Sequence, residues 1–111
     1  MVKTIKFTQK LADEILAGRK TATWRLFDDK NLSEGDVVEL AVKESLKKFA
    51  DAKILSVKEK TLGQIEDEDY AGQVKDESQS KMLETMRKHY GGQVTLETPV
   101  KIIRFELIEK R

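Results

Sequence analysis

The segment from Gly18 to Arg25 concentrates the side chains that could do chemistry. Its eight residues, Gly-Arg-Lys-Thr-Ala-Thr-Trp-Arg, bring together a lysine amine, two threonine hydroxyls, an indole and two guanidinium groups. A glycine stop, a short basic turn and a polar strand seldom occur together in an ordinary surface segment, so we place the candidate site here. By spacing alone, Lys20 is also typical of a solvated lysine in a turn.

The composition excludes several other classes of site. The chain has no cysteine, which excludes thiol nucleophiles, disulfides and cysteine-bound metals. A single histidine, His89, argues against a histidine-based metal site and against a Ser-His-Asp triad. The net charge of +1 gives no global attraction to nucleic acid, so a polyanion would need a local basic patch. We therefore expect neither a metal nor a cofactor.

A helix between two strands must position the segment. Residues 3–7 alternate polar and apolar side chains, which predicts a strand. Thr8 can cap a helix over residues 9–17, where apolar residues recur at helical spacing. Gly18 is suited to end that helix in a left-handed conformation. Residues 21–26, rich in threonine, predict the next strand.

The order of the remaining elements favours a β-rich α+β domain. Further strands are predicted over residues 36–42, 49–57 and 95–108, the second extending toward Lys60 and the last entered through Pro99. Two helices are too few for the crossovers that a parallel sheet needs. We therefore expect residues 1–111 to form a single domain, a small, mixed, partly closed β-barrel with two flanking helices.

The second helix is expected after an irregular acidic stretch. Residues 66–69 are interpreted as a solvated acidic loop. Either Asp76 or Ser78 offers the helix cap, and Gly91-Gly92 ends the helix.

Strand geometry sets a condition on the segment from Gly18 to Arg25. Side chains alternate between the faces of a strand, so Thr23 shares a face with Arg25 while Lys20 would fall on the other face. Lys20 and Thr23 can approach each other only if Lys20 still belongs to the turn after Gly18, or if a bulge intervenes. We adopt the turn, because the long lysine side chain can reach back.

The same segment carries a family resemblance. Residues 15–25, ILAGRKTATWR, resemble the signature of the ASCH domain, roughly I-L-x-G-x-K-T followed by a threonine and an arginine. Residues 35–38, GDVV, are similar to a strand start of that family. The resemblance extends over nearly the whole chain, although only residues 15–25 match specifically. It implies a PUA-like fold.

Within that family the chain is most similar to small bacterial amidohydrolases that remove the acetyl group from N(4)-acetylcytidine. The resemblance implies that Lys20 and Thr23 are catalytic, with the threonine as nucleophile and the lysine as its base. It implies that Glu77 supplies the acid, with the neighbouring Asp76 as its rival. The implied substrate is a small nucleoside.

Such chemistry needs Lys20 in its neutral form. A lysine ordinarily has a pKa of about 10.4, which burial or a neighbouring cation lowers. Arg19 and Arg25 are the candidates for that cation. Both arginines, together with Thr21 and Trp24, are also candidate substrate contacts, and Thr21 is a second candidate nucleophile.

A second hypothesis is a PUA-like module that binds RNA or a modified nucleotide without turnover. Aromatic residues make up only 6% of the chain and the net charge is near zero, which favours a small ligand over a long RNA. Ordinary structural roles also stay open. Trp24 is typical of core packing, Arg25 of an ion pair across the sheet, and Glu77 of a carboxylate in the first turn of a helix.

The location is expected to be cytoplasmic, with no membrane partner. The N-terminal residues MVKTIKF lack the apolar core of a signal peptide. No apolar run approaches the ~18 residues that suggest a transmembrane helix. The oligomeric state is not predicted.

Overall fold

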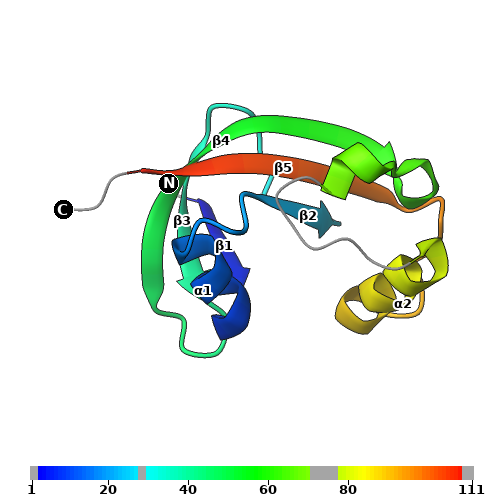
Figure 1. The fold of residues 1–111 in the computed structure, drawn as a ribbon, viewed down its shortest axis with the longest axis horizontal. Helices are drawn as coiled ribbons and strands as arrows, with labels where there is room; N and C mark the ends of the chain where they lie inside the picture. Colours follow the sequence, from blue (N-terminus) through cyan, green and yellow to red (C-terminus); the bar gives the residue numbers. More distant parts are fainter. Residues whose placement is uncertain (1–2, 28–29, 71–77, 109–111) are drawn as a thin grey trace.

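The computed structural model describes residues 3–27, 30–70 and 78–108. In chain order, the elements in these ranges are β1 (Lys3–Phe7), α1 (Gln9–Leu16), β2 (Ala22–Leu26), β3 (Val37–Val42), β4 (Lys48–Thr61), two 3-10 helices (Leu62–Gln64 and Asp67–Tyr70), α2 (Gln79–Tyr90) and β5 (Pro99–Ile108). Figure 1 shows the two α-helices at opposite ends of the long axis of the sheet.

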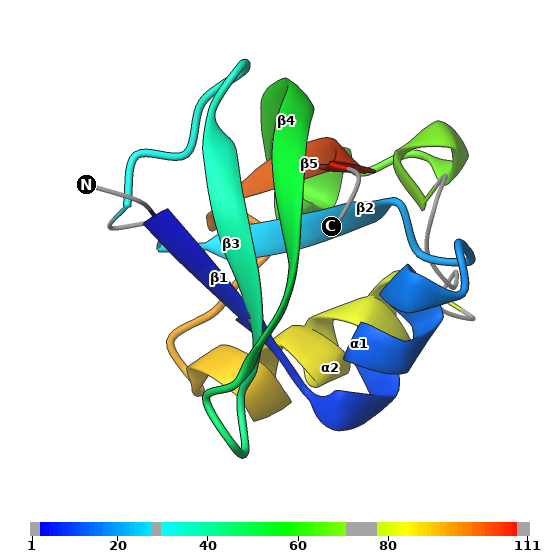
Figure 2. The ribbon, with the colours of Figure 1, turned by 90° about the vertical axis from the view of Figure 1, so that its left-hand side faces the viewer.

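The strands form one mixed, curled sheet in the order β1-β3-β4-β5-β2. Only the β1–β3 pair is parallel among these neighbours; the other three pairs are antiparallel. Register shifts between Leu40 and Ala41 in β3 and between Ile54 and Ser56 in β4 mark irregularities of the kind that bend strands. Figure 2 shows β2 and β5 crossing behind β3 and β4 at a steep angle. The predicted α+β fold, a partly closed barrel with flanking helices, is confirmed as a half-barrel.

Two apolar cores lie on the two faces of β5. Ile103 and Phe105 pack into a core that includes Ile15 of α1. Val100 and Ile102 pack into the other core, which includes Met82 of α2. The alternation of side chains along one strand therefore gives each helix its own apolar surface to cover.

The element boundaries are close to those predicted. Helix α1 is capped by the Thr8 hydroxyl, which accepts from the Leu11 amide. Ser78 caps α2, accepting from the Lys81 amide, whereas Asp76 lies outside the described residues. Residues 95–98 are not part of the last strand, because the Thr98 hydroxyl accepts from the Thr95 amide and closes a turn before β5 begins at Pro99.

Candidate functional site

The turn between α1 and β2 places Lys20 outside the strand. Gly18 has a φ of +82°, a left-handed conformation that glycine adopts without steric cost. The Glu14 carbonyl then accepts from the backbone amides of both Arg19 and Lys20, at 3.0 and 3.2 Å. Since β2 begins only at Ala22, the alternation of side chains between the two faces of a strand does not determine where the Lys20 side chain points. The turn that we expected is therefore present.

The Lys20 side chain is buried against the outer edge of β2. Only 8% of the residue is exposed, and its Nζ donates to the Ala22 carbonyl at 2.7 Å. The Thr21 carbonyl accepts from the Phe105 amide of β5, so the next carbonyl, that of Ala22, faces away from β5. Nζ therefore lies beside the peptide unit that joins Ala22 to Thr23.

This environment changes the acidity of Lys20. Burial, with a smaller contribution from the positive charge of Arg25, lowers the pKa of the Lys20 ammonium from 10.5 to about 8. A group with that pKa exists in both protonation states near neutral pH, as a general base must. Of the two arginines considered as the neighbouring cation, Arg25 has this effect.

Thr23 and Arg25 occupy one face of β2. Thr23 is 5% exposed and lies opposite Ile103 of β5. Arg25 donates through Nη2 to the Lys6 carbonyl at 2.8 Å, and its guanidinium carbon lies 4.9 Å from the centroid of the Phe7 ring. Arg25 thus joins β2 to β1, the two outer strands of the sheet. Thr21 is exposed just before β2.

Arg19 is held away from this group. Its Nε donates to the Glu14 carboxylate at 2.9 Å, and the Arg19 side chain is 65% exposed. The hydrogen bond with Arg19 lowers the pKa of Glu14. Lys20 therefore lies beside the Ala22–Thr23 peptide unit and within electrostatic reach of Arg25, which shares a face of β2 with Thr23. Arg19 is directed toward the end of α1.

Trp24 lies on the opposite face of β2 from Thr23 and packs in the core with α2. It is 6% exposed, and its ring centroid is 4.8 Å from that of Tyr70. Its Nε1 donates to the Asp69 carbonyl at 3.1 Å. Core packing, the alternative role considered for it, describes its environment.

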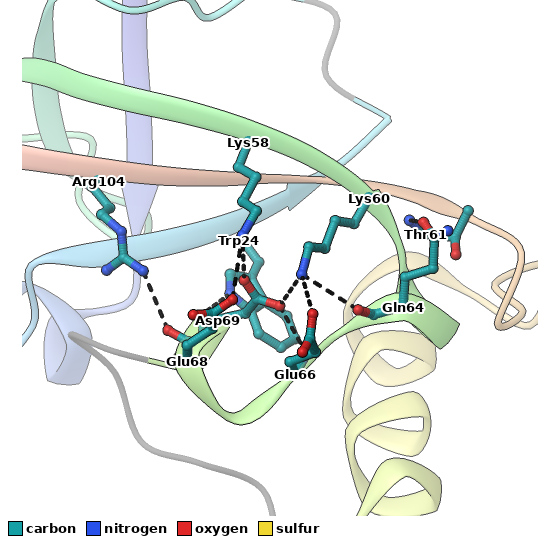
Figure 3. A network of polar contacts seen from close by, with 9 residues as sticks. All are labelled: Trp24, Lys58, Lys60, Thr61, Gln64, Glu66, Glu68, Asp69 and Arg104. Atoms are coloured by element: carbon teal, nitrogen blue, oxygen red, sulfur yellow. Dashed lines mark hydrogen bonds and ion pairs between the residues drawn. The ribbon is translucent and has the colours of Figure 1, made fainter.

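In the acidic stretch over residues 66–69, the first three residues are exposed, as the sequence indicated, but Asp69 is buried in a 3-10 helix and not solvated. Asp69 is 1% exposed, and its carboxylate accepts from Lys60 at 2.7 Å and from the Glu66 amide at 2.8 Å. Lys58 Nζ lies 3.5 Å from the same carboxylate. Figure 3 shows these contacts fixing the 3-10 helix under β4, next to Trp24. Alternating lysines at the end of β4 were the signal in the sequence for this ion-pair network.

Both candidates for the proposed acid, Glu77 and its rival Asp76, lie outside the described residues. Within the ranges that are described, no three His, Asp or Glu side chains are grouped so as to hold a metal ion. In the same ranges no helix is long and apolar enough to cross a membrane.

Comparison with known proteins gives matches by structure alone. No protein-family model and no curated protein sequence matches the chain. An ASCH domain from Lactobacillus crispatus JV V101 superposes with a TM-score of 0.70 at 17% identity, covering 95% of this chain and 79% of its own. A ZmASCH mutant protein from Zymomonas mobilis gives 0.67 at 12% identity, covering 96% and 71%. A DUF984 protein from Enterococcus faecalis V583 gives 0.74 at 14% identity, covering 97% and 80%. At these identities, the likeness is one of fold.

Proposed function

Because this chain has the fold of an ASCH domain, we propose that it is an amidohydrolase that removes the acetyl group from N(4)-acetylcytidine or a related acylated nucleoside. The motif over residues 15–25 supports this proposal from the sequence side. The observation that carries it in the structure is the burial of Lys20 beside the Ala22–Thr23 peptide unit, with a pKa lowered to about 8.

The lowered pKa provides a base for a threonine nucleophile. In the proposed reaction, the Thr23 hydroxyl oxygen attacks the acetyl carbonyl carbon while neutral Lys20 takes the hydroxyl proton. The ammonium so formed, together with Arg25, places positive charge near the oxyanion that develops on the substrate.

Collapse of the tetrahedral intermediate completes the first half of the reaction. The bond between the carbonyl carbon and the exocyclic nitrogen breaks, and the leaving amine receives a proton. Glu77 is the proton donor that the family resemblance implies. Water then hydrolyses the acetyl-threonine ester, which releases acetate and restores the hydroxyl.

Release of cytidine from N(4)-acetylcytidine by the purified protein tests the proposal. Thr23→Val replaces the hydroxyl with a methyl group of similar size and should abolish turnover, whereas Thr23→Ser keeps a hydroxyl and should retain part of it. Lys20→Met should lower the rate at least about 100-fold, as expected for the loss of a general base. Lys53→Met, at an exposed position on β4, is the matched lysine control.

Two results would contradict the proposal. Turnover that persists in Thr23→Val would exclude the threonine as nucleophile. A folded wild-type protein that binds nucleosides without releasing cytidine would favour the alternative, a PUA-like binding module.

A further inference from the structure

Two consecutive residues of β1 contact the guanidinium group of Arg25. The Lys6 carbonyl accepts from its Nη2 at 2.8 Å, and the centroid of the Phe7 ring lies 4.9 Å from its central carbon. The electron-rich face of an aromatic ring attracts a cation, and the attraction is stronger where water is excluded. Strand β1 therefore offers a backbone acceptor and an aromatic face to the same cation.

The place of β1 at the edge of the sheet makes both contacts possible. On its inner side β1 pairs with β3, and the Phe7 carbonyl accepts from the Lys43 amide at 2.7 Å. Because successive carbonyls of a strand point to opposite edges, the Lys6 carbonyl is directed away from β3 and toward Arg25. The edge of β1 thus meets the face of β2 that carries Thr23 and Arg25.

The Phe7 ring is itself fixed by the core. The residue is 3% exposed, and its ring centroid lies 6.4 Å from those of Phe49 on β4 and Phe105 on β5. A ring that is packed by two others has little freedom to turn. One hydrogen bond to a carbonyl sets a distance for the guanidinium group, and the fixed ring face adds the orientation of its plane.

The position of Arg25 affects the candidate base. The positive charge of Arg25 is the second cause, after burial, of the lowered pKa of Lys20. The interaction between two charges weakens as their separation grows, so a guanidinium group that was free to swing into solvent would affect Lys20 less. Whatever fixes Arg25 therefore also affects Lys20.

We propose that Phe7 is a positioning residue of the candidate site, whose ring holds the Arg25 guanidinium where its charge acts on Lys20 and on the oxyanion that forms beside Thr23. This inference rests on the proposed function for the reaction that Phe7 serves. The ring acts through Arg25, which separates its role from those of the proposed base and nucleophile.

Fluorinated phenylalanines at position 7 test the role of the ring face. Fluorine withdraws electron density from the face of a ring and changes its shape little, so one, two and three fluorine atoms should weaken its attraction for a cation stepwise. NMR titration should then show the pKa of Lys20 rising with each fluorine atom, toward its value in Arg25→Gln. The same series at Phe105, a buried ring of the same cluster, is the matched control and should leave the pKa of Lys20 unchanged.

Turnover should follow the change in pKa. Below the pKa of Lys20, an upward shift of about 0.3 halves the fraction of neutral amine, so N(4)-acetylcytidine hydrolysis at neutral pH should fall at least about twofold for such a shift. Turnover that stays at the wild-type rate despite a raised pKa would overturn the role of Phe7 in the reaction.

The titration also stands apart from the proposed function, because it needs no substrate. A Lys20 pKa that stays at the wild-type value through the series at position 7, or that rises equally in the Phe105 series, would overturn the inference. A wild-type protein without amidohydrolase activity would instead refute the proposed function, and the titration would still decide whether Phe7 positions Arg25.

Discussion

Replacing Lys20 with methionine should change how the stability of the protein depends on pH. The folded pKa of about 8 lies below the unfolded value of 10.5. Between these values the unfolded chain holds a proton that the folded chain has released, so raising the pH favours the folded state. Below pH 8 the folded protein carries the full cost of burying the ammonium, and above pH 10.5 it carries none.

The size of the effect follows from the same two values. A difference of about 2.5 pKa units at about 1.36 kcal/mol each gives about 3 kcal/mol. The wild-type protein should therefore gain about 3 kcal/mol relative to Lys20→Met between pH 7 and pH 11. At pH 7.5 about a quarter of the Lys20 amines would be neutral, against about one in a thousand for an ordinary lysine.

Urea unfolding of both proteins at half-unit pH intervals measures this difference directly. Taking the difference between the two proteins cancels the titration of the groups that they share. Lys10→Met, at an exposed position on α1, is the matched control. A wild-type-minus-variant difference that is flat over this range, or that falls as pH rises, would refute the argument that burial makes Lys20 a base.

Three further changes test the surroundings of the site. Arg25→Gln should raise the pKa of Lys20 but leave it below 10.5, because burial is the larger cause of the lowered pKa. NMR titration of the Lys20 side chain measures this pKa, and an unchanged value would contradict the electrostatic effect of Arg25. Trp24→Phe should destabilise the protein by about 1 kcal/mol in urea unfolding, since the Asp69 carbonyl loses its indole donor. Asp69→Asn should cost about 2 kcal/mol at neutral pH through its weakened bonds to Lys60. Burial alone would raise the pKa of the Asp69 carboxyl, but its hydrogen bonds to Lys60 and the Glu66 amide lower it overall. The stability that these bonds contribute is therefore lost as pH falls, and the difference in unfolding free energy between the wild type and Asp69→Asn should shrink in acid.

The sequence was sufficient for the elements because local signals agreed with the fold. The cap at Thr8 and the stop at Gly18 define α1, and the alternation along residues 99–108 separates the two cores. The position of Lys20 in the turn also followed from local geometry, since a regular strand would have directed it away from Thr23.

Contacts between distant residues were less predictable. The buried Asp69 depends on Lys60 of β4 and on the packing of Trp24 over the 3-10 helix, which no local pattern near residue 69 encodes. The hydrogen bond from Arg25 to the Lys6 carbonyl depends on the sheet curling until β1 and β2 approach each other. The roles of Thr23 and Glu77 stay predictions, because they derive from a family resemblance and require measurement of the reaction.

The two outer strands of the curled sheet have a consequence for how molecules of this protein meet each other. An exposed strand edge is a template for pairing with another chain. Arg25 donates a hydrogen bond to the Lys6 carbonyl on β1, and Lys20 donates one to the Ala22 carbonyl on β2. The Phe7 carbonyl accepts from Lys43, so the preceding Lys6 carbonyl faces the outer side of β1. The two cations of the candidate site thus also block edge carbonyls against intermolecular β-pairing, and variants at either position should aggregate more readily than the wild-type protein.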